Sequence, residues 1–340
     1  YKEFLSSINR KLYHEGEWQW QEGEYTVTRS HQYTAPGCHN SCGILLYTDK
    51  EGKLVKVEGD PLNPFNNGKL CMRCLNLVEA VNHPDRLKYP MKRVGERGEN
   101  KWERISWDEA IEIIVDKVNY YKKNYGPEVI IGVHGTGRNI NWQLPMLFNA
   151  GVQTPNISTL FFSGFACYLP RIVGCHAIAG DFMIVDASVQ HEDRYANKEW
   201  RHPECVIVWG NEPLKSNADG FLGHWLVQCM QMGTKVISVD PRLTWWSARA
   251  EVWLPIRPGT DAALAIGLLN VIIEEDLYDH EFVEKWTYGF EDLAQRVKEY
   301  PVEKVAEITG LNPEKIRKAA RIFATSKPAA VQWGLAFEQQ

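Results

Sequence analysis

The first clear alternation of apolar and polar positions lies between residues 43 and 59. There the segment GILLYTDKEGKLVKVEG has two short apolar runs on either side of the turn sequence DKEG. This pattern is typical of a β-hairpin. The segment that follows, DPLNPFNNG, is rich in Pro and Asn and predicts a loop.

A helical pattern begins further along the chain. The segment SWDEAIEIIVDKVNYYKKNYG has apolar residues at helical spacing, with Ser106 at the N-cap position and Glu109 three residues later. This combination is a capping box and predicts a helix that begins after Ser106. The next apolar run, EVIIGVHGTG, predicts a buried strand that leads into a Gly-rich turn.

From this point strand-like and helical segments alternate. The segments ECVIVWGNEP, KVISVDPR and AEVWLPI predict strands, and GFLGHWLVQCMQMG and GTDAALAIGLLNVIIEEDLY predict helices, the second of them largely buried. A further helix and strand are predicted in NPEKIRKAARIFATSKPAAVQWG. Strands separated by helices at this spacing indicate parallel sheets with helices on both faces, so the predicted fold class is α/β.

Composition and charge narrow the function classes. The chain has 340 residues, of which 44% are hydrophobic and 24% charged, and a formal net charge of -5. With no Lys/Arg block, this balance argues against nucleic acid as a partner. No run of about 18 apolar residues occurs, so we expect no direct membrane insertion. Residues 1–33 are polar and aromatic without clear periodicity, and we expect an N-terminal arm there.

Three predicted strands end in polar, turn-forming residues. These ends are WGNEPLKSNAD (209–219), VDPR (239–242) and PIRPGTDAA (255–263). In open α/β sheets, ligands bind at the carboxyl ends of the strands. A carboxylate can accept two donors from a ribose or a purine edge, and Gly210 and Asn211 can let the backbone approach a phosphate. One such loop is weak evidence, but three together favour a nucleotide-like ligand, although neither GxGxxG nor GxxxxGKS/T occurs.

Half of the eight cysteines lie in one short window. Cys38 and Cys42 lie just before the predicted hairpin, and Cys71 and Cys74 follow the loop. A disulfide framework is typical of small secreted domains rather than of a chain of this size. The C-x3-C and C-x2-C spacings suit a zinc site and an iron–sulfur cluster equally well. Spacing alone does not distinguish a zinc site from an iron–sulfur cluster.

Longer phrases resemble one enzyme family. EGDPLNPFNNGKLC, VNHPDRLKYPMKRVGERGENKWERISWDEA and VISVDPRLTWWSARAEVWLPIRPGTDAALAIGLLNVIIEEDLYDHEFVEKWT resemble the dimethyl sulfoxide reductase family. Its members carry molybdenum or tungsten on a bis(molybdopterin guanine dinucleotide) cofactor, bis-MGD. The resemblance runs from about Tyr33 to the last residue. It implies an N-terminal arm (1–33), a small iron–sulfur β-hairpin domain (34–92) and a Rossmann-like, molybdopterin-binding α/β region (93–340). Members are longer, so we expect further chain beyond Gln340. Because the chain starts at Tyr1 rather than Met, we also expect that an N-terminal segment has been removed.

The resemblance also assigns the cysteines of the hairpin domain. The family pattern is C-x2-C-x3-C, followed after a longer interval by a fourth cysteine. Cys38, Cys42 and Cys71 match its second, third and fourth places. The first place falls on Ala35, which has no side-chain atom that can bind iron.

The residues after Cys71 complete the comparison. Arg73 matches a basic residue that lies between the cluster and a pterin in relatives, and Cys74 stands where a Gly is usual. The fourth iron would be held by Cys74, His39 or His31, or be absent. The resemblance therefore implies a 4Fe-4S cluster or, with one ligand missing, a 3Fe-4S cluster.

A second region carries the assigned molybdenum or tungsten ligand. NISTLFFSGFACYLPRIVGCHAIAG resembles the ligand region of the family and assigns Cys167 to the metal. From its context alone, Cys167 would be a small buried residue. By the same resemblance, Tyr168, Arg171 and His176 face the substrate or support the ligand. Packing roles are expected for Cys175, Cys205 and Cys229.

The remaining assigned residues belong to the organic cofactor. By resemblance, a loop after the first buried strand lies near the cofactor, and its assigned residues are Gly135, Gly137, Arg138 and Asn139. The loops for the guanine dinucleotides contain Gly210, Asn211, Glu212, Ser216, Asp240, Arg242 and Asp261.

The implied function is a two-electron reaction on a small molecule, either oxygen-atom transfer or hydroxylation and its reverse. Electrons would pass by way of Arg73 and the cluster to a partner iron–sulfur subunit, with a membrane-anchor subunit as a further partner. Two alternatives remain: a non-redox hydratase or hydroxyl-transferring enzyme, and an electron-transfer subunit without molybdenum. The resemblance fits either a cytoplasmic or an exported protein.

Overall fold

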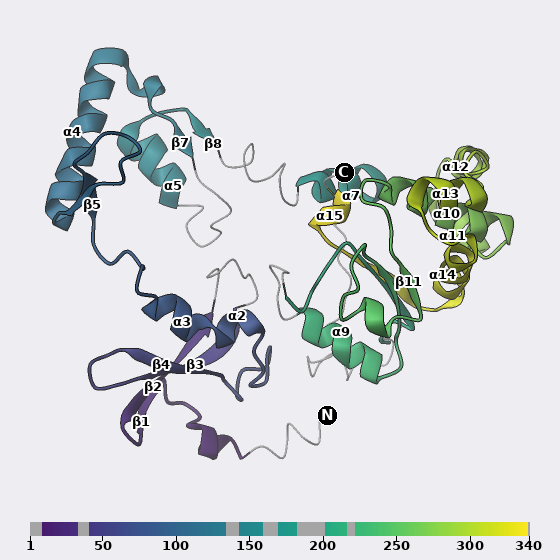
Figure 1. The fold of residues 1–340 in the computed structure, drawn as a ribbon, viewed down its shortest axis with the longest axis horizontal. Coiled ribbons are helices and arrows are strands. Elements are labelled where there is room, and N and C mark those ends of the chain that lie inside the picture. The colour runs from purple at the N-terminus through teal and green to yellow at the C-terminus, as the bar shows by residue number, and fades with distance from the viewer. Residues whose placement is uncertain are drawn as a thin grey trace.

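The computed structural model describes residues 9–32, 41–133, 143–158, 169–181, 201–215 and 222–338. Figure 1 shows three groups of elements: an N-terminal sheet with two short helices, a group around helix α4, and a second sheet flanked by the C-terminal helices. The first and third groups contain the residues that concern the candidate sites.

The first group is a four-stranded antiparallel sheet in the order β1-β2-β3-β4. Its strands are β1 (Gln19–Glu22), β2 (Tyr25–Gln32), β3 (Cys42–Thr48) and β4 (Leu54–Gly59), and the short 3₁₀ helix η1 (Arg10–Tyr13) precedes them. The predicted hairpin is confirmed as β3 and β4. Two strands were not predicted: β1 and β2 lie in the segment expected to be an arm, and β2 pairs with β3. The residues of these two strands are mainly polar, and in β2 only the Val27 side chain is fully buried.

Alternate residues of β3 face opposite sides of this sheet. On one side, Leu45 and Tyr47 pack with Trp20 and Val27. On the other, Ile44 packs with the helices α2 (Met72–Leu75) and α3 (Leu77–Asn82). Because Cys42 is two residues before Ile44, its side chain is on the α2 side of the sheet.

The second group surrounds α4 (Trp107–Tyr125), the helix predicted from its capping box. Ser106 Oγ accepts a hydrogen bond from the Glu109 backbone N–H at 3.1 Å, as expected. The other elements here are β5 (Met91–Arg93), β6 (Trp102–Arg104), η2 (Pro127–Val129), β7 (Gly132–Val133), α5 (Gln143–Pro145), the π-helix η3 (Met146–Val152) and β8 (Ile157–Ser158). The expected burial of β7 was wrong: the chain pairs there with β8 over two residues, and Ile131 and Val133 are 64% and 59% exposed.

The third group contains a parallel sheet in the order β11-β10-β9-β12. Its strands are β9 (Cys205–Trp209), β10 (Lys235–Val239), β11 (Val252–Leu254) and β12 (Ala329–Trp333), and every neighbouring pair is parallel. All four were predicted. From β9 the chain proceeds to β10 and β11, and it returns to the other side of β9 as β12. The carboxyl ends of β9 and β12 therefore lie side by side.

Helices cover both faces of this sheet, as predicted. Ile207 and Ile237 face α10 (Asp261–Glu274), α13 (Val302–Thr309) and α14 (Pro313–Thr325). Val206 and Val236 face α9 (Leu222–Gln231), together with Trp246 beside the 3₁₀ helix η4 (Ser247–Arg249). The remaining described helices are α7 (Leu169–Ala179), α11 (His280–Trp286), α12 (Phe290–Val297) and α15 (Leu335–Glu338). Among the described helices, none has both the length and the apolar composition needed to cross a membrane.

Candidate cofactor and cluster sites

The parallel sheet brings several predicted site residues to one edge. Gly210, Asn211 and Glu212 follow β9, while Asp240 and Arg242 follow β10. Carboxyl ends of parallel strands meet at the same edge, so these residues share it with the first turn of α10.

Asp261 is the best-defined carboxylate at this edge. It is buried in the first turn of α10, where the helix dipole favours a negative charge. Trp209 Nε1 donates a hydrogen bond to Asp261 Oδ1 at 2.6 Å. Asp261 Oδ2 is also buried, but it has no hydrogen-bond partner among the described residues. A buried carboxylate oxygen needs a donor, and the amide or hydroxyl groups of a nucleotide are suitable ones.

Two more buried carboxylates, in the loops after β9 and β10, lie at the same edge. Glu212 accepts a hydrogen bond from Trp246 Nε1 at 3.1 Å. Asp240 accepts from the Arg242 backbone N–H at 2.8 Å and from Arg242 Nε at 3.3 Å. The bond with Asp240 raises the pKa of the Arg242 guanidinium, whose side chain is largely exposed at the edge of the sheet. The Arg242–Asp240 ion pair therefore lies at the exposed edge of the sheet.

The backbones after β9 and β12 approach each other closely. A Cβ atom at Gly334 would lie 2.5 Å from the Gly210 carbonyl oxygen, and Gly210 itself has a φ of +55°. Asn211 Nδ2 donates to the Trp333 carbonyl oxygen at 3.1 Å. The Asn211 amide therefore fastens the β9 loop to β12, a role that the sequence did not predict.

Helix α7 reaches the same edge. The guanidinium carbon of Arg171 lies 5.8 Å from the centroid of the Trp333 ring. His176, further along α7, is exposed. Helix α7 begins two residues after Cys167, but Cys167 and Tyr168 lie outside the described residues, as do Cys38, Gly135, Gly137, Arg138, Asn139 and Ser216.

The cysteines form the second candidate site. Cys42, Cys71 and Cys74 are all buried. Cys71 and Cys74 pack in the same cluster as Ile44, on the side of the sheet that Cys42 also faces. Within the described parts of the chain, no three His, Cys, Asp or Glu side chains lie close enough together to bind one metal ion.

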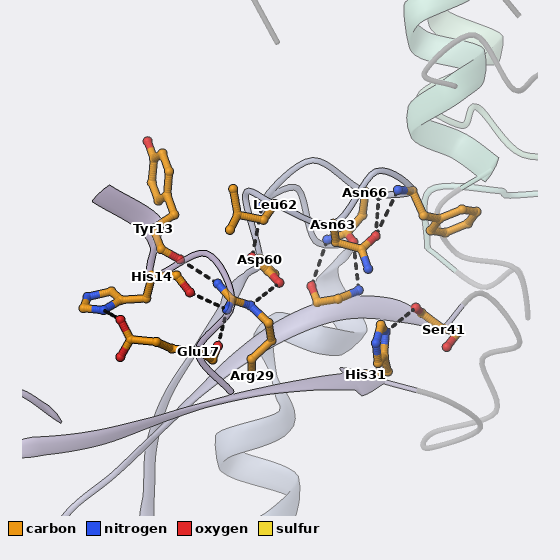
Figure 2. A network of polar contacts seen from close by, with 12 residues as sticks. Tyr13, His14, Glu17, Arg29, His31, Ser41, Asp60, Leu62, Asn63 and Asn66 are labelled. Carbon is orange, nitrogen blue, oxygen red and sulfur yellow. Dashed lines mark hydrogen bonds and ion pairs between the residues drawn. The ribbon is translucent and has the colours of Figure 1, made fainter. Parts of the chain in front are cut away.

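A buried asparagine holds the two cysteine-bearing segments together. Asn66 Oδ1 accepts from the Gly43 backbone N–H at 2.8 Å, and Asn66 Nδ2 donates to the carbonyl oxygens of Gly43 at 3.0 Å and Lys69 at 2.9 Å. Asn66 therefore connects the residue after Cys42 with the segment just before Cys71. Figure 2 shows Asn66 and its neighbours in this network.

A salt bridge fixes the start of the same loop. Arg29 Nε donates to Asp60 Oδ2 at 2.7 Å, and the Asp60 backbone N–H donates to the Gly43 carbonyl oxygen at 3.0 Å. Arg29 also donates to the backbone carbonyl oxygens of Tyr13, His14 and Glu17 (Figure 2). Neither Asn66 nor the Arg29–Asp60 pair was predicted as part of a site, because each acts through contacts distant in sequence.

The surroundings of Cys71 favour its thiolate. A hydrogen bond with the Cys74 side chain, backbone N–H groups of Cys74 and Arg73, and the Arg73 charge lower the pKa of Cys71 to about 5, against the effect of burial. Thiolates are the form of cysteine that binds metals. Across the sheet, Gln32 pairs with Cys42, and its buried Nε2 has no hydrogen-bond partner among the described residues. Cluster sulfurs accept such hydrogen bonds, so this environment fits an iron–sulfur cluster.

The loop between β4 and Cys71 (residues 60–70), here called the cluster loop, contacts the parallel-sheet region. The rings of Phe65 and Trp225 lie edge to face, with centroids 5.2 Å apart. The preceding residue on α9, His224, is close enough for the Leu70 backbone and Cys71 to affect its pKa, which burial lowers overall. The sequence did not indicate this contact, because one histidine on a helix is not a recognisable signal.

These two sites agree with the comparisons to known proteins. Residues 34–83 match the family described as "Molybdopterin oxidoreductase Fe4S4 domain", and residues 86–340 match the family described as "Molybdopterin oxidoreductase". The chain belongs to the molybdopterin oxidoreductase family. The predicted membership, the molybdopterin cofactor and the iron–sulfur cluster are thereby confirmed, and the predicted zinc alternative is not favoured.

Several members of known name are similar to this chain. It is 36% identical over 315 residues to acetylene hydratase of Syntrophotalea acetylenica, covering 89% of the chain and 40% of that protein. It is 32% identical to dimethyl sulfoxide reductase DmsA of Escherichia coli, covering 87% of the chain and 39% of the relative. The structure of acetylene hydratase from Pelobacter acetylenicus matches with a TM-score of 0.70 at 34% identity, over 89% of this chain and 40% of that one. The chain thus spans about two fifths of the length of these relatives.

Proposed function

We propose that this chain is the cofactor-binding part of the catalytic subunit of a molybdenum or tungsten oxidoreductase with a bis-MGD cofactor. The reaction is a two-electron oxygen-atom transfer, or a hydroxylation or its reverse, on a small molecule. When bound, the cofactor supplies the two-electron chemistry, and the protein supplies binding, orientation and electrostatics.

The observation that supports this proposal most is the buried carboxylate oxygen of Asp261 at the edge of the parallel sheet. Its unsatisfied Oδ2 is suited to accept hydrogen bonds from a guanine or ribose, while Arg242 is suited to bind a phosphate. Gly210 and Gly334, whose backbones approach each other closely at this edge, add no side chains of their own to it. We assign Cys167 as the metal ligand, with Tyr168, Arg171 and His176 beside the substrate.

The iron–sulfur domain supports a redox function, because its cluster would carry electrons to or from the cofactor. Arg73, whose charge already acts on Cys71, is assigned to the space between cluster and cofactor. We propose a partner iron–sulfur subunit as the source or acceptor of electrons. Escherichia coli DmsA, 32% identical, is named as a dimethyl sulfoxide reductase, which fits a redox function for this chain as well.

The test uses the full-length protein, purified without oxygen. Metal analysis and nucleotide release by acid are expected to give molybdenum or tungsten with two guanine nucleotides per metal. Reduced viologen dyes should then be oxidised by S-oxides, N-oxides or another oxygen-atom donor, and Cys167→Ala should abolish this turnover while retaining the iron.

Other results would point elsewhere. Turnover of an unsaturated or hydroxylated substrate without any electron donor or acceptor would indicate a hydratase, as the similarity to acetylene hydratase allows. A protein that holds iron but neither molybdenum nor tungsten would indicate an electron-transfer subunit.

A further inference from the structure

The iron–sulfur domain of this chain lacks one of the usual ligands. Its match to the Fe4S4 domain covers residues 34–83, and three cysteines stand at family positions: Cys38, Cys42 and Cys71. The remaining position is occupied by Ala35, which has no donor atom. A four-iron cluster takes four protein ligands, so another residue of the domain has to provide the fourth.

Cys74 lies directly beside Cys71, one of the assigned ligands. Cys71 is the N-cap residue of α2, and Cys74 lies in the first turn of that helix. Both are buried, and their side chains are close enough to share a hydrogen bond. Ferredoxins use the same C-x2-C spacing to bind different irons of one cluster.

Cys74 also lies on the correct side of the sheet. It packs with Cys71 and Ile44 in one cluster of buried residues. Side chains of β3 alternate between the faces, so Cys42 and Ile44 point to the same side. Cys42, Cys71 and Cys74 therefore all lie between the sheet and α2.

A histidine ligand from β2 is disfavoured by the same alternation. His31 pairs with Gly43, whereas Gln32 pairs with Cys42. Cross-strand partners point to the same face, so the His31 side chain is on the face opposite to Cys42. Its Nδ1 lies 3.3 Å from the Ser41 carbonyl oxygen and its ring is exposed (Figure 2).

Packing alone accounts poorly for this residue. A small apolar side chain would fill the same volume beside Leu77 and Ile44. The Cys74 side chain, however, makes a hydrogen bond with Cys71. An apolar side chain could not make this contact, which brings a second sulfur beside an assigned iron ligand.

We propose that Cys74 is the fourth ligand of the iron–sulfur cluster and replaces the cysteine whose position is taken by Ala35. Cys74 then completes a ligand set with Cys42 and Cys71, and with Cys38, which only the family resemblance assigns because it lies outside the described residues. Each thiol loses its proton to solvent as its sulfur bonds to iron. The inference rests on the cluster of the proposed function but not on any turnover at the molybdenum or tungsten site.

The experiment uses full-length protein purified without oxygen, with iron and labile sulfide analysis and electron paramagnetic resonance (EPR) spectra of oxidised and reduced samples. The wild type is expected to hold four irons and to give a signal only after reduction. Cys74→Ala is expected to lose one iron and to show the signal of an oxidised three-iron cluster. Cys205→Ala, which removes another fully buried thiol, is the matched control and should keep four irons.

A rescue separates ligation from folding. The double variant with Ala35→Cys and Cys74→Ala restores the usual family pattern and is expected to regain the fourth iron. If Cys74→Ala does not fold, Cys74→Gly provides the residue usual at this position and is tested alone and with Ala35→Cys.

Each other outcome is decisive. Four irons and unchanged spectra in folded Cys74→Ala or Cys74→Gly would overturn the inference and leave Cys74 a packing residue. A three-iron wild type would overturn it too, while the proposed cofactor chemistry would stand. A wild type without iron would remove both the inference and the electron relay in the proposed function.

Discussion

Arg29 and Asp60 are 31 residues apart in the sequence, yet Arg29 Nε lies 2.7 Å from Asp60 Oδ2 in a largely buried ion pair. Arg29 holds the N-terminal segment through backbone carbonyl oxygens, and Asp60 starts the loop that leads to Cys71. The pair therefore joins residues before the sheet to the cluster loop.

Replacing Asp60 by Asn should destabilise the iron–sulfur domain. The change leaves the Arg29 charge buried without its partner, which costs on the order of 3–5 kcal/mol. Denaturant unfolding and iron content measure the effect. Glu281→Gln is the control, because the Lys285–Glu281 pair is exposed and is worth about 0.5 kcal/mol or less. Equal losses in both variants would contradict a special role for Arg29–Asp60.

Gly59→Ala should disturb the same loop. A Cβ atom at Gly59 would lie 2.3 Å from the Gly68 carbonyl oxygen, so the backbone has to move. We expect a loss of about 1–3 kcal/mol in the free energy of unfolding and a lower iron content. Gly174→Ala is the control, since a Cβ there meets no atom of the described residues within 4 Å. Full iron content in Gly59→Ala would show that the loop can shift without harm to the cluster.

Asp261→Asn should weaken binding of the organic cofactor. The change preserves shape but removes the negative charge and replaces one acceptor oxygen with a donor. A lost hydrogen bond to a charged group is worth about 1.5–3 kcal/mol, which corresponds to roughly a tenfold to hundredfold loss in affinity. The amount of guanine nucleotide that acid releases from the purified variant, compared with wild type, measures this loss of cofactor binding.

The matched control for this carboxylate is Asp279→Asn. Asp279 caps α11 through the Phe282 backbone N–H at 2.9 Å, and Asn is an equally good N-cap residue. Its guanine content should equal that of the wild type. If Asp261→Asn also retains all of its guanine nucleotide, the proposed site at the sheet edge is wrong.

Cys205 should make the stability depend on pH in the alkaline range. Burial in β9 raises the pKa of this thiol from 9.0 to about 12. The folded state therefore favours the protonated thiol, and this contribution is complete below pH 9 and decreases as the pH rises from 9 to 12. The unfolding free energy of the wild type, minus that of Cys205→Ala, should fall across this interval. A constant difference would show that the thiol ionises as easily in the folded protein as in the unfolded one.

The parallel sheet was predictable because each of its strands and helices has a recognisable pattern within its own segment of sequence. Strand β9 and helix α10 are nearly continuous apolar segments, and the Ser106 cap and the turn in the hairpin rely on neighbouring residues. Strands β1 and β2 were missed since their residues are mainly polar, and only pairing with β3 makes them strands. The burial expected for β7 failed for a related reason: an apolar sequence does not by itself provide a packing partner.

The sequence by itself determined the family, the cysteine and carboxylate candidates, and the strands and helices of the parallel-sheet region, because motifs and hydrophobic periods are local properties of the chain. Only the tertiary structure decided which candidates meet. It placed Cys74 beside Cys71, His31 on the opposite face from Cys42, and Asp261 at the same sheet edge as the β9 and β10 loops. Such relationships depend on strand register and on contacts between distant segments, which no local pattern specifies.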